Sequence, residues 1–110
     1  MFKTGSKFSG WYEAPAPWGR TDYTMTMETY NKDGSFTGRG QEKQGGFSAR
    51  GTVSGTSFKM VKDFDNKSIV GIKYDGTVNN DTVSGNYSFL YQEPGFSKQV
   101  TQPFSMKLSN

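Results

Sequence analysis

The chain has 110 residues and a mass of 12.2 kDa, which is enough for one domain, residues 1–110, around a single core. It carries 13 Lys and Arg against 10 Asp and Glu, and the basic residues are scattered, so the net charge of +3 predicts an ordinary solvated surface. The chain has no Cys and no His, which excludes disulfides and the usual zinc ligands. We therefore expect neither a metal site nor a cofactor.

The first residues lack the apolar run of a signal peptide, and no stretch approaches the roughly 18 apolar residues of a membrane span. These observations predict a cytoplasmic protein with no membrane partner.

Short strands separated by glycine-bearing turns follow one another along the whole chain. Tyr23, Met25 and Met27 alternate with polar residues, which is the period of a half-buried strand, and the same rhythm recurs after each turn. The predicted strands are 8–13, 23–28, 36–41, 47–53, 58–64, 70–76, 83–91 and 102–109.

About eight strands are enough to close a barrel and hide every sheet edge. The sequence therefore predicts an all-β fold, a single antiparallel up-and-down β-barrel, with a β-sandwich as the alternative. Closure is favoured by glycines in the inward phase, which ease the coiling of a small sheet. These glycines are Gly38, Gly40, Gly51, Gly76 and Gly85.

Two short motifs carry a family resemblance. Gly10-Trp11-Tyr12 opens the first strand, and a hairpin reads Asp33-Gly-Ser-Phe-Thr-Gly38. Together with Ala49-Arg-Gly-Thr and Lys73-Tyr-Asp-Gly76, they resemble the calycin barrels, namely avidins, lipocalins and fatty-acid-binding proteins, with the avidin-type opening closest.

The resemblance implies that Trp11 closes one barrel end beneath a basic residue of the last strand, here Lys107. The chain departs from avidins because it has only Trp11 and Trp18, whereas several tryptophans clamp biotin in that family. Biotin is therefore not the expected ligand.

The inward-facing side chains predict a non-catalytic protein that holds a small apolar or amphipathic ligand inside the barrel. Buried tyrosine hydroxyls without partners cost about 1–3 kcal/mol each, so several inward tyrosines imply a polar network, water or a ligand that they orient. The candidate ligand-binding residues are Tyr12, Trp18, Tyr23, Met25, Phe36, Phe58, Met60, Lys62, Tyr74 and Tyr87.

Lys62 is in phase with Phe58 and Met60, and an ammonium inside a barrel requires an acid, a ligand anion or access to water. The alternative is a β-bulge near Val61 that turns Lys62 outward. The irregular connection 13–21 carries two prolines and is interpreted either as a lid that presents Trp18 and Arg20 to the ligand or as a loop folded back on the barrel.

Other functions remain as alternatives. Nucleophile-elbow, phosphate-loop and dinucleotide motifs are missing, which favours a binding protein over an enzyme. A barrel of the OB type that stacks single-stranded nucleic acid is disfavoured because the rings lie in the inward phase. A structural module or inhibitor would use the Trp18 loop or the threonine-rich outer face, on which such barrels also form homo-oligomers.

Overall fold

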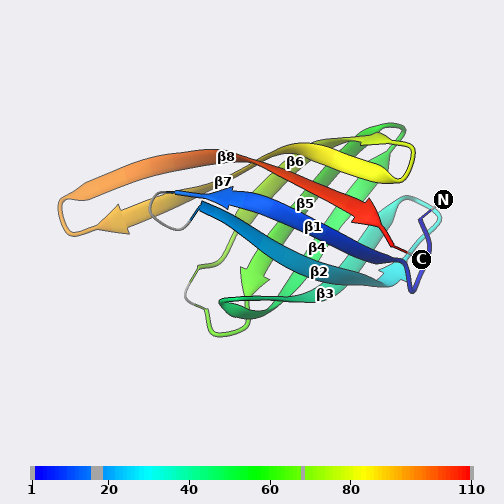
Figure 1. Ribbon diagram of the computed structural model, residues 1–110, viewed down its shortest axis with the longest axis horizontal. Coiled ribbons are helices and arrows are strands. Elements are labelled where there is room, and N and C mark those ends of the chain that lie inside the picture. Colours follow the sequence, from blue (N-terminus) through cyan, green and yellow to red (C-terminus); the bar gives the residue numbers. More distant parts are fainter. Residues whose placement is uncertain (1, 16–18, 68, 110) are drawn as a thin grey trace.

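The computed structural model describes residues 2–15, 19–67 and 69–109, and its strands close into one barrel (Figure 1). The strands are β1 (Lys7–Ala14), β2 (Gly19–Tyr30), β3 (Ser35–Glu42), β4 (Gly45–Ser54), β5 (Ser57–Phe64), β6 (Ile72–Asn79), β7 (Thr82–Glu93) and β8 (Phe96–Leu108). Each strand pairs antiparallel with the next, and β8 pairs with β1. The predicted all-β, up-and-down barrel of eight strands is confirmed, and the sandwich alternative is wrong.

Within the three described ranges, the structure contains no helix of the length and apolar character required to cross a membrane.

The tight turns fit the residues that form them. Between β2 and β3, the Asp33 carboxylate accepts hydrogen bonds from the backbone N–H of Ser35 at 2.9 Å and from its hydroxyl at 2.6 Å. Gly34 follows with φ +88°, and a Cβ there would lie 2.1 Å from the carbonyl oxygen of Val53. Only glycine fits this position, because both the backbone conformation and the close approach of β4 exclude a side chain.

The core is the barrel lumen, where large side chains lie over glycines on neighbouring strands. Gly40 lies opposite Phe47, and a Cβ at Gly40 would be 2.3 Å from that ring. Gly51 is opposite Phe36 in the same way, with a closest ring distance of 2.8 Å. The inward glycines therefore make room for rings as well as easing the curvature of the sheet.

The strand registers settle the orientation of Lys62. β4 and β5 pair without a register shift from the pair Ser54–Ser57 to the pair Phe47–Phe64. This register places Lys62 opposite the buried Ala49. The proposed bulge near Val61 is therefore wrong. The register shift that the structure does contain lies in β2, between Met27 and Thr29.

Hairpin β7–β8 extends far beyond the rest of the barrel and is the orange segment at the left of Figure 1. β7 pairs with β6 only as far as Ser88, and β8 pairs with β1 only from Phe104 onward. We refer to residues 89–103 as the arm, and to the barrel end from which it projects as the arm end. The arm contributes to the long dimension of the molecule, 44 Å against 25 and 23 Å.

Several predicted strand boundaries differ from the structure, and two of the differences have a clear cause. The last strand begins at Phe96 and not at residue 102, because a short turn lets β8 pair with the whole of β7. The strand predicted at 70–76 begins only at Ile72, since Gly71 has φ +72° and its N–H is held at 2.6 Å by the Asp63 carboxylate. Val70 is therefore exposed.

Candidate functional site

A buried ion pair lies inside the barrel near the arm end. The ammonium of Lys62, on β5, donates a hydrogen bond to Oε2 of Glu42 at 2.6 Å. The Glu42 side chain has no exposed surface, and that of Lys62 is 1% exposed. The other carboxylate oxygen, Oε1, accepts a hydrogen bond of 2.5 Å from the hydroxyl of Tyr12 on β1. Three strands thus contribute to one polar cluster in the lumen.

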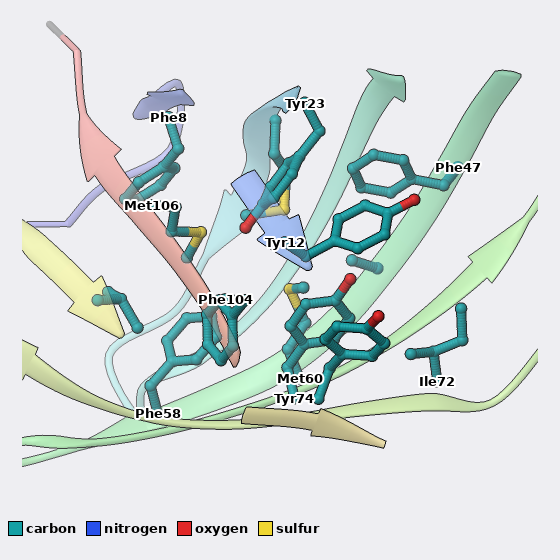
Figure 2. Packing of buried hydrophobic residues seen from close by; sticks show 14 of the residues in the cluster. Phe8, Tyr12, Tyr23, Phe47, Phe58, Met60, Ile72, Tyr74, Phe104 and Met106 are labelled. Carbon is teal, nitrogen blue, oxygen red and sulfur yellow. The ribbon is translucent and has the colours of Figure 1, made fainter. Parts of the chain in front are cut away.

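Five aromatic rings surround the Lys62 ammonium, and we refer to them as the aromatic cage. The distances from Nζ to the ring centroids are 4.6 Å for Phe47, 4.8 Å for Tyr12, 4.9 Å for Phe64, and 5.5 Å for Tyr23 and Tyr74. Figure 2 shows the labelled cage rings inside the barrel. Ring faces attract cations, and the effect is largest where water is excluded. The cage and Glu42 together compensate the burial of the charge.

Burial shifts the titration of the groups in this cluster. Loss of hydration lowers the pKa of Lys62, and the Glu42 carboxylate opposes that shift. Burial also raises the pKa of Tyr12, and its hydrogen bond to Glu42 raises it further. Burial likewise raises the pKa of Tyr74. The tyrosine hydroxyls are therefore neutral donors at physiological pH.

The remaining two tyrosines differ in their hydrogen bonding. The hydroxyl of Tyr87 donates a hydrogen bond to the backbone carbonyl of Glu13. Glu13 follows Tyr12, which forms the last pair of β1 with β8 by lying opposite Phe104. Burial raises the pKa of Tyr87 to about 12. Tyr23 is different, because its buried hydroxyl has no hydrogen-bond partner among the residues that the structure describes. An unsatisfied buried hydroxyl costs about 1–3 kcal/mol, so the site has a spare donor.

The structure brings together half of the residues proposed from the sequence. Tyr12, Tyr23, Lys62, Tyr74 and Tyr87 form one cluster at the arm end.

The other proposed core residues lie further from the arm. Met25 and Met60 are the next inward residues along β2 and β5, and Phe36 and Phe58 stack at 5.5 Å in the other half of the barrel. All four are buried.

Sequence reasoning missed Glu42. The inward phase of β3 runs through Phe36, Gly38 and Gly40, and Glu42 is the next residue in that phase. Alternation alone therefore indicated an acid inside the barrel, available to Lys62. The cage residues Phe47 and Phe64 lie in the inward phase of β4 and β5, but alternation alone does not make them neighbours of the ammonium.

The proposed lid is not supported where the structure describes it. Trp18 lies outside the described residues. Arg20 belongs to β2 and extends over the ring of Trp11 at 4.9 Å on the outer face. Trp11 is adjacent to the inward Tyr12 and so points outward, beneath Arg20 and not beneath Lys107. The end-closing role that the family resemblance implied for Trp11 is therefore wrong.

The outer wall carries polar side chains and includes two open hollows. One hollow of 470 Å³ includes Trp11, Arg20 and Asp22 in its lining, and another of 380 Å³ lies over β4, β5 and β6. Cross-strand ion pairs join Arg50 to Asp63 at 3.0 Å and Lys59 to Asp75 at 2.8 Å. Within the described ranges, no group of three or more metal-ligating side chains occurs.

A line of rings runs out of the lumen onto the arm. Tyr74 and Tyr87 stack with centroids 5.6 Å apart, and Tyr87 and Phe89 are parallel at 6.3 Å. Alternation places Tyr91 on the same face as Phe89, and register places Phe96 opposite Glu93, again on that face. We refer to Tyr74, Tyr87, Phe89, Tyr91 and Phe96 as the aromatic row. Its first residues are buried, whereas Tyr91 and Phe96 are 45% and 53% exposed.

Fold and site together define a small closed antiparallel β-barrel, consistent with a calycin-like barrel, with an ion pair and tyrosines inside it. Comparison of the chain with protein-family models, with curated proteins and with solved structures finds no match.

Proposed function

We propose that this protein is a non-catalytic binding protein for a small, largely apolar or amphipathic ligand, which it holds at the arm end of the barrel. The observation that supports this proposal is the aromatic row, which continues from the buried Tyr74 to the exposed Phe96. Large apolar side chains on the lumen side of a sheet are normally covered. Here the row offers a ligand a surface that leads into the core.

The gain on binding follows from the exposed part of the row. Each apolar Å² removed from water contributes about 25 cal/mol, and small-molecule sites are lined predominantly by hydrophobic and aromatic side chains. The interior beyond the cage is occupied by fully buried side chains such as Phe58 and Met60, so we place the ligand along the row and not deeper in the barrel.

The polar part of an amphipathic ligand is served by tyrosine hydroxyls. Tyr23 supplies a donor with no partner among the described residues, and the adjacent Lys62 contributes a positive charge that Glu42 balances. A neutral acceptor such as a carbonyl or ether oxygen suits this environment, because it adds no net charge to a buried ion pair.

The test uses a fluorescent apolar probe, 1-anilinonaphthalene-8-sulfonate, with two arm variants. Phe96→Ser removes a ring from the row, and Leu90→Ser removes an equally exposed side chain, 54%, from the opposite face of the same hairpin. We expect the wild type and the Leu90→Ser variant to bind the probe alike, and Phe96→Ser to bind it several-fold more weakly.

Native mass spectrometry of protein purified from its source complements the probe. A small mass that is lost on denaturation would support the proposal and begin to identify the ligand. Equal loss of probe binding in both variants, or none in either, would refute a site on the aromatic row.

A further inference from the structure

The arm leaves one edge of β8 without a partner strand in the described part of the chain. From Phe96 to Pro103, β8 pairs with β7 on one side, while β1 pairs only with residues 104–108 on the other. The N–H and C=O groups along this edge are therefore available to another strand. An isolated two-stranded ribbon is at best marginally stable in water, and unpaired edges readily recruit further strands.

The usual protection against such pairing is sparse on this edge. β7 and β8 pair without a register shift from the pair Glu93–Phe96 to the pair Thr82–Lys107. No bulge therefore twists the edge of β8 away from an approaching strand. Lys98 is the single charged residue between Phe96 and Gln102. Pro103, which has no N–H to donate, lies where the free edge meets β1.

We infer that the free edge of β8 pairs antiparallel with the same edge of a second copy of this chain, forming a two-fold symmetric dimer. Two identical edges are necessarily of equal length, and antiparallel pairing about a two-fold axis makes the contact self-complementary. The β7–β8 arms of the two copies then form one four-stranded antiparallel sheet.

The position of Lys98 selects the register. With the axis at Gln99, Lys98 lies opposite Val100, Ser97 opposite Thr101 and Phe96 opposite Gln102, so the pairing uses nearly the whole edge. With the axis at Lys98, two ammonium groups would face each other, which destabilises a sheet. An axis at Val100 would place Phe96 opposite Phe104, whose edge is already paired with β1.

The register also explains an exposed side chain. Leu90 lies opposite Gln99 on the face away from the lumen and is 54% exposed. In the dimer, the pair of Gln99 side chains at the axis is flanked on each side by Leu90, which forms a row across the four strands. Cross-strand neighbours of this kind are the unit of stabilisation in a sheet. Phe96 and Tyr91 stay on the opposite face, so dimer and ligand site are independent.

The contact is short compared with the 1,200–2,000 Å² or so that stable interfaces typically bury, so the dimer should be weak and concentration-dependent. Sedimentation velocity over a range of concentrations measures it. Gln99→Lys places like charges at the axis and should weaken the dimer several-fold. The control, Gln92→Lys, adds the same charge to the same face of the arm but on β7, and should leave the association unchanged.

A crosslink tests the register directly, because the chain contains no Cys. Residues directly opposite in an antiparallel pair have Cα atoms about 4.5–5.5 Å apart, within the range of a disulfide. Under mild oxidation, Gln99→Cys should therefore form a covalent dimer much faster than Gln92→Cys.

Equal crosslinking of the two Cys variants, or a protein that stays monomeric up to its solubility limit, would overturn self-pairing. The second result would leave the edge to a strand from a different protein.

Discussion

Replacement of Glu42 by Gln isolates the charge at the centre of the barrel. The substitution keeps the shape of the side chain and an oxygen that accepts a hydrogen bond, but it removes the negative charge that lies 2.6 Å from the Lys62 ammonium. Because Lys62 is almost completely buried, it cannot recover its hydration without opening the barrel. The folded state must therefore keep an unbalanced cation or release its proton.

The expected loss follows from two opposing effects. Removing one partner of a buried ion pair costs about 3–5 kcal/mol. The aromatic cage remains in the variant and still attracts the ammonium, and such contacts contribute about 2 kcal/mol where water is excluded. Because the cage is present in both proteins, it is not subtracted from this cost, but it places the cost at the lower end of the range. We therefore expect the free energy of unfolding to fall by about 3 kcal/mol at pH 7 in Glu42→Gln. Small domains have about 5–15 kcal/mol in total, so the variant should still fold.

The loss should shrink as the pH rises. Burial already lowers the pKa of Lys62, and without the carboxylate that opposes this shift the pKa falls further. In the unfolded chain a Lys titrates at about 10.4. At pH values between the lowered pKa of Lys62 in the folded variant and its pKa in the unfolded chain, the unfolded state binds more protons than the folded state. The free energy of unfolding of the variant therefore rises with pH in this range. The gap between wild type and variant should therefore be smaller at pH 9 than at pH 7.

Urea unfolding followed by circular dichroism at pH 7 and pH 9 measures both quantities. Glu28→Gln, at an exposed position of β2, is the matched control and should lie within about 0.5 kcal/mol of wild type. The double variant Glu42→Gln with Lys62→Met removes the stranded charge and should recover most of the loss, because apolar replacement of a buried ion pair is often neutral. A loss of under about 1 kcal/mol at pH 7, or one that does not change with pH, would refute the reasoning.

Two further predictions concern hydrogen bonding and packing in the lumen. Tyr23→Phe deletes a buried hydroxyl with no partner among the described residues, so it should raise the free energy of unfolding by about 1 kcal/mol. Tyr12→Phe deletes a hydrogen bond to the buried Glu42 carboxylate, so it should lower the free energy of unfolding by about 1.5–3 kcal/mol. Equal effects in urea unfolding would contradict the assignment. Gly40→Ala places a Cβ 2.3 Å from the Phe47 ring and should cost about 1–3 kcal/mol. Gly38→Ala meets nothing closer than 3.1 Å and should cost clearly less, and melting temperatures that rank the two in reverse order would disprove the packing argument.

The sequence predicted the closed barrel and the inward tyrosines because alternation is a local property. Once the phase of a strand is known, each residue is assigned to a face, and the inward assignments of Tyr12, Tyr23 and Tyr74 are confirmed. The orientation of Lys62, which the sequence left open between two alternatives, is inward. The same rule places Trp11 outside, next to an inward Tyr12. The family resemblance, which placed Trp11 at the barrel end, was less reliable than the phase.

The ion pair and the arm were not predicted, for different physical reasons. Glu42 and Lys62 lie on β3 and β5, which are not neighbours in the sheet, so their contact depends on the stagger of the strands and the width of the lumen. The arm exists because β7 and β8 extend beyond β6 and β1, and that difference depends on where the neighbouring strands end. No local pattern in residues 89–103 contains that information.

The seam between β1 and β8 imposes an order on biosynthesis. It pairs Phe8 with Leu108 and Tyr12 with Phe104, which are among the most distant contacts that the described chain allows. On the ribosome, β1 therefore waits with one edge open until nearly the whole of this sequence has been made, and closure carries the entropic cost of a very long loop. A chain that stalls before β8 emerges presents the open edges of β1 and β7 to its neighbours. Such a nascent chain is the form of this protein that would depend most on chaperones.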